Sequence, residues 1–116
     1  MRQRNLYMWR GEDISLTIVL EGSGSIADQD FRFDLRGDRE EEDTVPALVT
    51  KTIGDGLTIV DPDARTLLLV LNSADTIDLV DGQDLVGWWE VASVDPGNNA
   101  SLAGGFLTIR NRSVRV

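Results

Sequence analysis

Histidine and cysteine are both absent from this 116-residue sequence. Their absence excludes most imidazole and thiol catalysis, the usual zinc sites and every disulfide bond. Long apolar runs are also missing, because the longest covers only residues 67–71, whereas a membrane-spanning helix needs roughly 20 apolar residues. The basic first residues lack the apolar stretch of a signal peptide. We therefore expect a protein that folds in a cytoplasm and does not associate with a membrane.

Acidic residues are missing from both ends of the chain, and basic residues are few in its middle. All twenty acidic side chains lie between Glu12 and Asp95, together with only five of the eleven basic ones. The middle therefore carries a formal charge of −15, and the six remaining basic side chains give the two ends +6. The net charge of −9 disfavours general nucleic-acid binding, because most of the surface would repel phosphate. This sorting of charge is typical of a protein held against a partner.

Alternation of apolar and polar residues is the main pattern that is present. Residues 14–20 and 31–36 place apolar side chains at every second position, which predicts strands with one buried face. The expected strands cover residues 5–9, 14–20, 31–36, 47–53, 57–60, 66–71, 87–94 and 105–110. The only helix-like segment covers residues 73–79, with Ser73 as its candidate N-cap.

About eight short strands with almost no helix predict an all-β fold, either an antiparallel β-sandwich or a small barrel. The hydrophobic content of 41% and the charged content of 27% are ordinary for a folded globular domain. The length allows a single domain over residues 1–116 that buries a substantial core.

Carboxylates are the side chains left to carry chemistry. Six aspartates form the densest set of oxygen ligands and offer an alternative interpretation as a calcium site: Asp61, Asp63, Asp75, Asp78, Asp81 and Asp84. Their spacing does not match a calcium-binding loop, and aspartate is common in turns and caps for structural reasons. No two of the twenty acids stand out as a glycosidase pair. We therefore predict no enzymatic activity, no metal site and no cofactor.

Trp88 and Trp89 are adjacent within an expected strand. Neighbouring residues of a strand point to opposite faces of a sheet, so one indole is expected in the core and the other on the outward face. An outward tryptophan is either covered by a loop or by the first strand, or it contacts a partner.

The basic ends of the chain also contain apolar residues, which favours docking over solvated tails. Because the ends of a sandwich often lie close together, the two groups of arginines are candidates for one positive patch. The candidate partner-binding residues are Arg2, Arg4, Tyr7, Trp9, Arg10, Trp88, Trp89, Arg110, Arg112 and Arg115.

In order along the chain, five segments resemble landmarks of a family of small phage virion proteins. They are the Trp-Arg-Gly-Glu-Asp step at residues 9–13, the strand ending in Leu-Arg at 31–36, the Ser-x-x-Thr half-turn at 73–76, the Gly-Trp-Trp strand at 87–91, and the final glycine, strand and Val-Arg tail at 104–115. Order and spacing carry this resemblance, which covers nearly the whole chain. The chain departs from the family pattern at Trp88 and Trp89, where tyrosines are usual.

The resemblance implies an immunoglobulin-like β-sandwich, similar to the N-terminal domain of phage baseplate upper proteins and to capsid cement or decoration proteins. It implies a non-enzymatic virion structural protein, made in the host cytoplasm, that binds major capsid protein or tail or baseplate subunits and forms a homo-oligomer on the virion. A lone domain favours capsid cement, with a tail or baseplate adaptor as the alternative. A carbohydrate-binding module that uses Trp88 or Trp89 is a further alternative.

Overall fold

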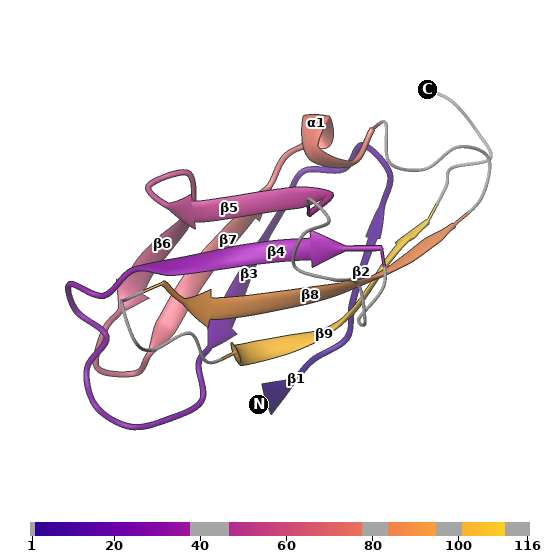
Figure 1. The fold of residues 1–116 in the computed structure, drawn as a ribbon. Helices are drawn as coiled ribbons and strands as arrows, with labels where there is room; N and C mark the ends of the chain where they lie inside the picture. Colours follow the sequence, from indigo (N-terminus) through magenta and orange to yellow (C-terminus); the bar gives the residue numbers. More distant parts are fainter. Residues whose placement is uncertain (1, 38–46, 78–83, 95–100, 111–116) are drawn as a thin grey trace.

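The computed structural model describes residues 2–37, 47–77, 84–94 and 101–110, which form strands and one short helix (Figure 1). The strands are β1 (Arg2–Gln3), β2 (Leu6–Trp9), β3 (Ile14–Val19), β4 (Phe31–Arg36), β5 (Val49–Ile53), β6 (Gly56–Asp61), β7 (Thr66–Leu71), β8 (Leu85–Ser93) and β9 (Ser101–Arg110). The helix is α1 (Ser73–Thr76). Among the described residues, no helix has the length and apolar character needed to cross a membrane.

The strands form two layers that are joined at one side. The larger layer has the order β2–β9–β8–β4–β5, with β1 also paired to β9, and the smaller layer has the order β6–β7–β3. The layers are joined by the tight turn from β5 to β6, where only Thr52 with Gly56 and Ile53 with Leu57 are paired. This strand order is that of an immunoglobulin-like sandwich. The expected fold class is confirmed.

Not every strand pair is antiparallel, which corrects one part of the prediction. Both β1 and β2 run parallel to β9, and the short β5–β6 pairing is also parallel. The pairs β3–β7, β4–β5, β4–β8, β6–β7 and β8–β9 are antiparallel as expected. Side chains alternate between faces in either direction, so the sequence pattern contains no information on the direction of pairing.

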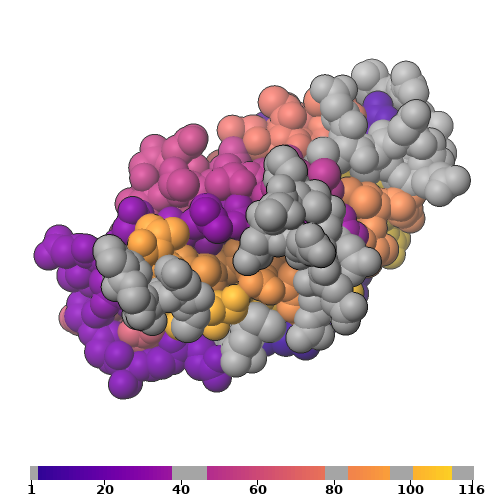
Figure 2. All heavy atoms as spheres, in the orientation of Figure 1, coloured from indigo at the N-terminus to yellow at the C-terminus, as the bar shows by residue number. Residues whose placement is uncertain are grey.

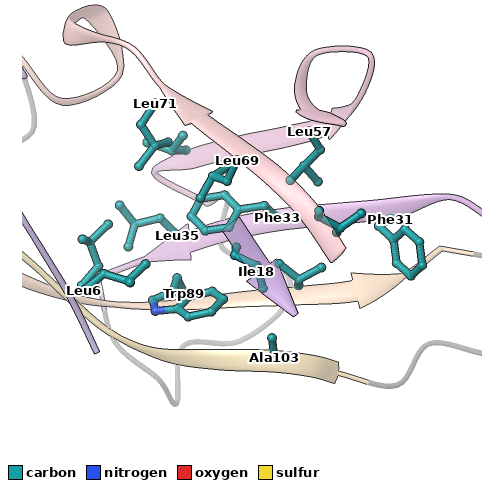
Figure 3. Packing of buried hydrophobic residues seen from close by; sticks show 14 of the residues in the cluster. Leu6, Ile18, Phe31, Phe33, Leu35, Leu57, Leu69, Leu71, Trp89 and Ala103 are labelled. Atoms are coloured by element: carbon teal, nitrogen blue, oxygen red, sulfur yellow. The ribbon is translucent and has the colours of Figure 1, made fainter. Parts of the chain in front are cut away.

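The core lies between the two layers and is filled by alternate residues of each strand (Figure 3). Strands β4 and β7 contribute its centre, with side chains that are at most 1% exposed: Phe31, Phe33, Leu35, Leu67, Leu69 and Leu71. Trp89 of β8, the strand next to β4 in the larger layer, packs among them. The alternation of buried and outward residues in β4 and β7 therefore supplies the side chains that fill the space between the two layers.

Helix α1 is one short turn within the predicted segment 73–79, whose last two residues lie outside the described residues, and its N-cap is Asn72 rather than Ser73. Asn72 has extended backbone angles, and its N–H donates to Asp75 Oδ2 at 2.7 Å. Asp75 Oδ1 accepts a second hydrogen bond from Lys51 Nζ at 3.0 Å. Because Lys51 belongs to β5 and both side chains are largely buried, this ion pair fixes the helical turn against the sheet.

Strand β9 approaches the N-terminal segment closely at Gly105. A Cβ atom at this position would overlap the carbonyl oxygen of Arg4. The same carbonyl oxygen accepts a hydrogen bond from Trp89 Nε1 at 3.0 Å. Gly105, Arg4 and Trp89 therefore form one packed unit that joins the first strands to the core.

Candidate interaction surface

Outward side chains of β2, β9 and β8 form an apolar surface at one edge of the larger layer. Tyr7 pairs with Thr108, which pairs in turn with Val86, and Trp9 and Phe106 lie to either side of this row. The exposed fractions are 65% for Tyr7, 42% for Trp9, 54% for Val86 and 41% for Phe106. We call these four residues the apolar face. Figure 2 shows atoms of β8 and β9 reaching the surface on the outward side of the larger layer.

The alternation of these strands explains why the apolar face is exposed. Leu6 and Met8 of β2 enter the core, so Tyr7 and Trp9 must point outward. In β9, Phe106 lies between residues that face the core, which directs its ring to the same outward side. Contiguous exposed apolar side chains of this kind mark contact surfaces in folded proteins.

Trp88 is the expected outward-facing indole, and its side chain is covered instead of being presented at the surface. Its side chain lies on the outward face of β8 but is only 2% exposed. Phe106 contacts it edge to face, with ring centroids 5.0 Å apart. The indole Nε1–H donates to Glu90 Oε1 at 2.7 Å, so its polar atom is satisfied as well. Phe106, and not Trp88, presents an aromatic ring at the surface here.

Trp89 occupies the core, as one of the two tryptophans was predicted to do. It is fully buried and stacks on Phe33 with ring centroids 6.1 Å apart. Neither adjacent indole is accessible, so the surface platform that the carbohydrate-binding alternative needs at Trp88 or Trp89 is absent from these two positions.

Replacing Phe106 with alanine should uncover Trp88. The expected result is a red shift of tryptophan emission and stronger quenching by iodide, at a cost of about 1 kcal/mol for the lost aromatic contact. The measurement is best made in a Trp9→Phe background, because Trp9 is already 42% exposed. Val60→Ala, which truncates an exposed side chain of β6, is the control. Unchanged emission and quenching for Phe106→Ala would show that other residues cover Trp88.

The ends of strands β2 and β9 meet at one corner of the apolar face. Parallel pairing places Trp9 beside Arg110, and the Arg10 N–H donates to the Arg110 carbonyl oxygen at 2.8 Å. Arg110 is exposed and Arg10 is half-buried. Two cationic residues, one from each end of the sequence, therefore adjoin the exposed indole of Trp9.

The other candidate arginines do not gather at this corner. Strand pairing sets Arg2 beside Ala103, at the far end of β9 from Arg110. Arg4 is exposed and reaches across to the smaller layer, where its Nη1 donates to the Thr17 carbonyl oxygen at 2.7 Å. Two of the predicted contact residues, Arg112 and Arg115, lie outside the described residues.

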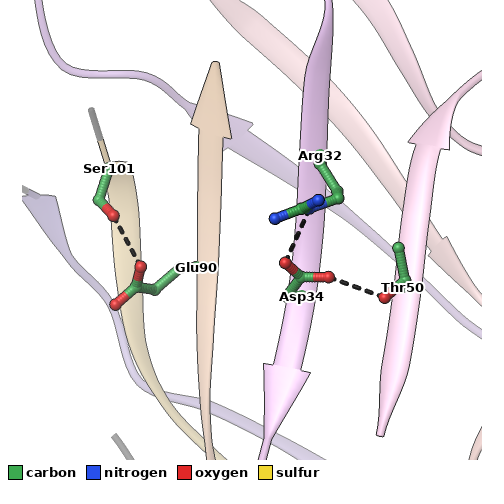
Figure 4. Close-up of polar contacts among 5 residues, drawn as sticks. All are labelled: Arg32, Asp34, Thr50, Glu90 and Ser101. Atoms are coloured by element: carbon green, nitrogen blue, oxygen red, sulfur yellow. Dashed lines mark hydrogen bonds and ion pairs between the residues drawn. The ribbon is translucent and has the colours of Figure 1, made fainter. Parts of the chain in front are cut away.

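The middle of the outward face is polar and internally bonded (Figure 4). Asp34 and Glu90 lie directly opposite each other on β4 and β8, an arrangement of like charges that destabilises a sheet when nothing compensates it. Asp34 accepts hydrogen bonds from Arg32 Nε at 2.9 Å and from Thr50 Oγ1 at 2.7 Å. Glu90 accepts one from Ser101 Oγ at 2.6 Å, besides the indole bond above. These hydrogen bonds compensate the two facing carboxylates, so Asp34 and Glu90 have a structural role in the sheet.

Two of the described aspartates considered as calcium ligands, Asp61 and Asp75, serve local structure. Asp61 Oδ1 accepts the Ala64 N–H at 3.1 Å in the turn after β6, and Asp75 caps α1. Asp78 and Asp81 lie outside the described residues. Within the described ranges, no group of three or more acidic side chains is arranged to hold a metal ion.

Comparison with known proteins does not place the chain in a family. No protein-family model matches it, and no curated protein matches it in sequence. Among solved structures, the chain is similar to the extracellular domain of the voltage-gated sodium channel beta4 subunit, which was described as a parallel homodimer with a role in cell–cell adhesion. That likeness has 13% identity and a TM-score of 0.42, and it covers 97% of this chain and 94% of the other. The fold assignment rests on the strand order alone.

Proposed function

We propose that this chain is a non-enzymatic virion structural protein that attaches to an assembled phage surface, with capsid cement as the favoured role. The observation that carries attachment is the apolar face with Arg10 and Arg110 at its corner. The virion setting is supported by the ordered segments that resemble small phage virion proteins. The partner in this proposal is the major capsid protein.

The composition of the surface suits a protein partner. Tyrosine, tryptophan and arginine are the residues that most often dominate the binding energy of interfaces. Here Trp9 pairs with Arg110, Tyr7 lies two residues before Trp9 on the same strand, and Arg10 follows Trp9 in the chain. Arginine also forms bidentate hydrogen bonds with carboxylates, which favours an acidic rim on the partner. The net charge of −9 makes copies in solution repel one another while the cationic corner turns toward the shell.

Cement activity follows from repetition of this contact. Each copy adds a modest contact to the shell, and many copies bound to one lattice act together through multivalency. In this proposal the copies form a homo-oligomer on the particle, where the shell supplies the symmetry. A tail or baseplate adaptor would use the same surface at a different place on the virion, so separated heads and tails distinguish the two locations.

Particles of the encoding phage that lack the protein provide the test. Purified protein should bind their heads saturably, and Trp9→Ser combined with Phe106→Ser should weaken binding at least about tenfold, or 1.4 kcal/mol. Arg110→Glu should weaken it as well, and the loss should shrink at high salt because screening reduces exposed charge interactions. Sedimentation of particles with bound protein measures each affinity.

The matched control is Val60→Ser, which removes an exposed apolar side chain from β6 in the other layer. It should bind heads as the parent does. Binding to tails alone would move the assignment to the adaptor role. Absence of the protein from purified virions, or full binding by the double serine variant, would overturn the proposal.

A further inference from the structure

Strand β3 forms one edge of the smaller layer, and among the described residues no strand pairs with its outer side. Leu20 N–H donates to the Arg65 carbonyl oxygen on the β7 side, which fixes the alternation of hydrogen bonds along β3. Ser15, Thr17 and Val19 therefore direct their N–H and C=O groups away from β7. The bond from Arg4 to the Thr17 carbonyl oxygen agrees with this assignment.

This edge lacks the devices that usually prevent edge pairing. The six residues of β3 include no charged residue, proline or glycine, and their register with β7 is regular. Natural edge strands are usually blocked by charges, prolines or bulges, because an open edge is a template for another strand. The described contacts beyond the edge are the Arg4 guanidinium and, past the end of β3, the Glu21 N–H, which donates to Leu102 O at 3.3 Å.

A cavity of about 340 Å³ lies beside the same edge, where the two layers separate. Its lining combines apolar side chains with the polar N-terminal segment: Gln3, Arg4, Ile18, Val19, Trp89 and Ala103. A strand added to β3 would point every second side chain toward this cavity. Its accessible lining is Gln3, Arg4 and Val19, because Ile18, Trp89 and Ala103 are at most 2% exposed. The space is large enough to receive an aliphatic side chain from the middle of such a strand.

Charge around the edge indicates what kind of strand fits. Glu12 and Asp13 precede β3 and Glu21 follows it, so acidic residues bracket an uncharged strand. A second copy of β3 fits poorly, because antiparallel pairing centred on Thr17 would place Asp13 opposite Glu21 of the other copy. A segment with basic residues at its ends would meet opposite charge at both.

We propose that the outer edge of β3 binds an extended protein segment as an added strand, with an aliphatic side chain in the cavity beside Val19 and Arg4 and basic residues at both ends. Main-chain hydrogen bonds to Ser15, Thr17 and Val19 supply the contact, and the cavity and the acidic flanks supply selectivity. This site lies apart from the apolar face and does not depend on the virion assignment.

The test uses the full chain and the synthetic peptide Arg-Val-Thr-Leu-Thr-Val-Arg, with amide exchange followed residue by residue by NMR. At saturating peptide, the Ser15, Thr17 and Val19 amides should exchange at least about tenfold more slowly, while Leu16 and Ile18 should change little because they already bond to β7. The same peptide with glutamate at both ends is the charge control and should give no protection. Unchanged exchange at these three amides with millimolar basic peptide would overturn the proposal, as would equal protection by the glutamate peptide.

Two variants examine the mechanism. Thr17→Pro removes an outward N–H at a position where an edge strand tolerates proline, and it should weaken peptide binding about tenfold, whereas Thr17→Val should bind as the parent does. Arg4→Ala releases the Thr17 carbonyl oxygen and should tighten binding about fivefold. Should Thr17→Pro fail to fold, as circular dichroism would show, Arg4→Ala decides alone, and unchanged or weaker binding by it contradicts pairing at this edge.

Discussion

Replacing Gly105 with alanine should destabilise the protein by about 3 kcal/mol, because overpacking against a rigid backbone cannot be relieved by a side-chain movement. The added methyl group would overlap the Arg4 carbonyl oxygen. Relief requires the segment that joins β1 and β2 to move away from β9. That movement would also break the hydrogen bond from Trp89 Nε1, which a buried indole needs.

Urea unfolding followed by circular dichroism measures this loss. Thr108→Ala, on the outward face of the same strand, should change stability by less than about 0.5 kcal/mol. Trp89→Phe keeps most of the packing but removes the donor, and should cost about 1 kcal/mol. In a Gly105→Ala background, Trp89→Phe should add less than this 1 kcal/mol, because the Arg4 carbonyl oxygen has already moved away from the indole. A parent-like urea midpoint for Gly105→Ala would refute the close approach at Arg4.

Replacing Asp75 with alanine should cost about 3 kcal/mol, since removal of one partner leaves a mostly buried charge without compensation. Asp75 accepts hydrogen bonds from the Lys51 ammonium and from the Asn72 N–H, so the change also removes one of the two bonds of the capping box at the start of α1. The side chains of Lys51 and Asp75 are 11% and 18% exposed, so little water can solvate the Lys51 ammonium once Asp75 is removed.

The reciprocal variant separates the charge from the packing. Lys51→Met alone leaves the Asp75 carboxylate mostly buried without its cation, so it should also cost about 2 to 3 kcal/mol. Combined with Asp75→Ala it removes the second charge as well, so the double variant should be more stable than Asp75→Ala alone by about 1 kcal/mol. Urea unfolding of the three variants gives the comparison. A double variant that loses the sum of the two single losses would show that packing, and not an uncompensated charge, dominates this contact.

Most of the fold was predictable because its strands alternate strictly. Residues 31–36 and 66–71 were expected as strands and are β4 and β7, since a single apolar face leaves only one way to bury them. The expected joining of the two arginine groups is seen only between Arg10 and Arg110, whose main chains are hydrogen-bonded, whereas Arg2 and Arg4 lie elsewhere. Asn72 was missed as the N-cap because asparagine and serine are equally suited to that position.

The surface was harder to predict, because exposure depends on neighbouring strands. Trp88 points outward because its neighbour Trp89 faces the core, and Phe106 from the adjacent strand covers it. Phe106 and Val86 were not considered, although each is an apolar residue at an outward position of its strand. Recognising them requires the order of β2, β9 and β8, which no local pattern contains.

Parallel pairing of the first and last strands has a mechanical consequence. Residues 6–9 and 107–110 run side by side in the same direction, so a pull on opposite ends of the chain slides one strand along the other. The hydrogen bonds between them then bear the load together instead of opening one after another. A domain built in this way resists stretching along the axis that joins its two ends, where a hairpin between the same strands would peel apart.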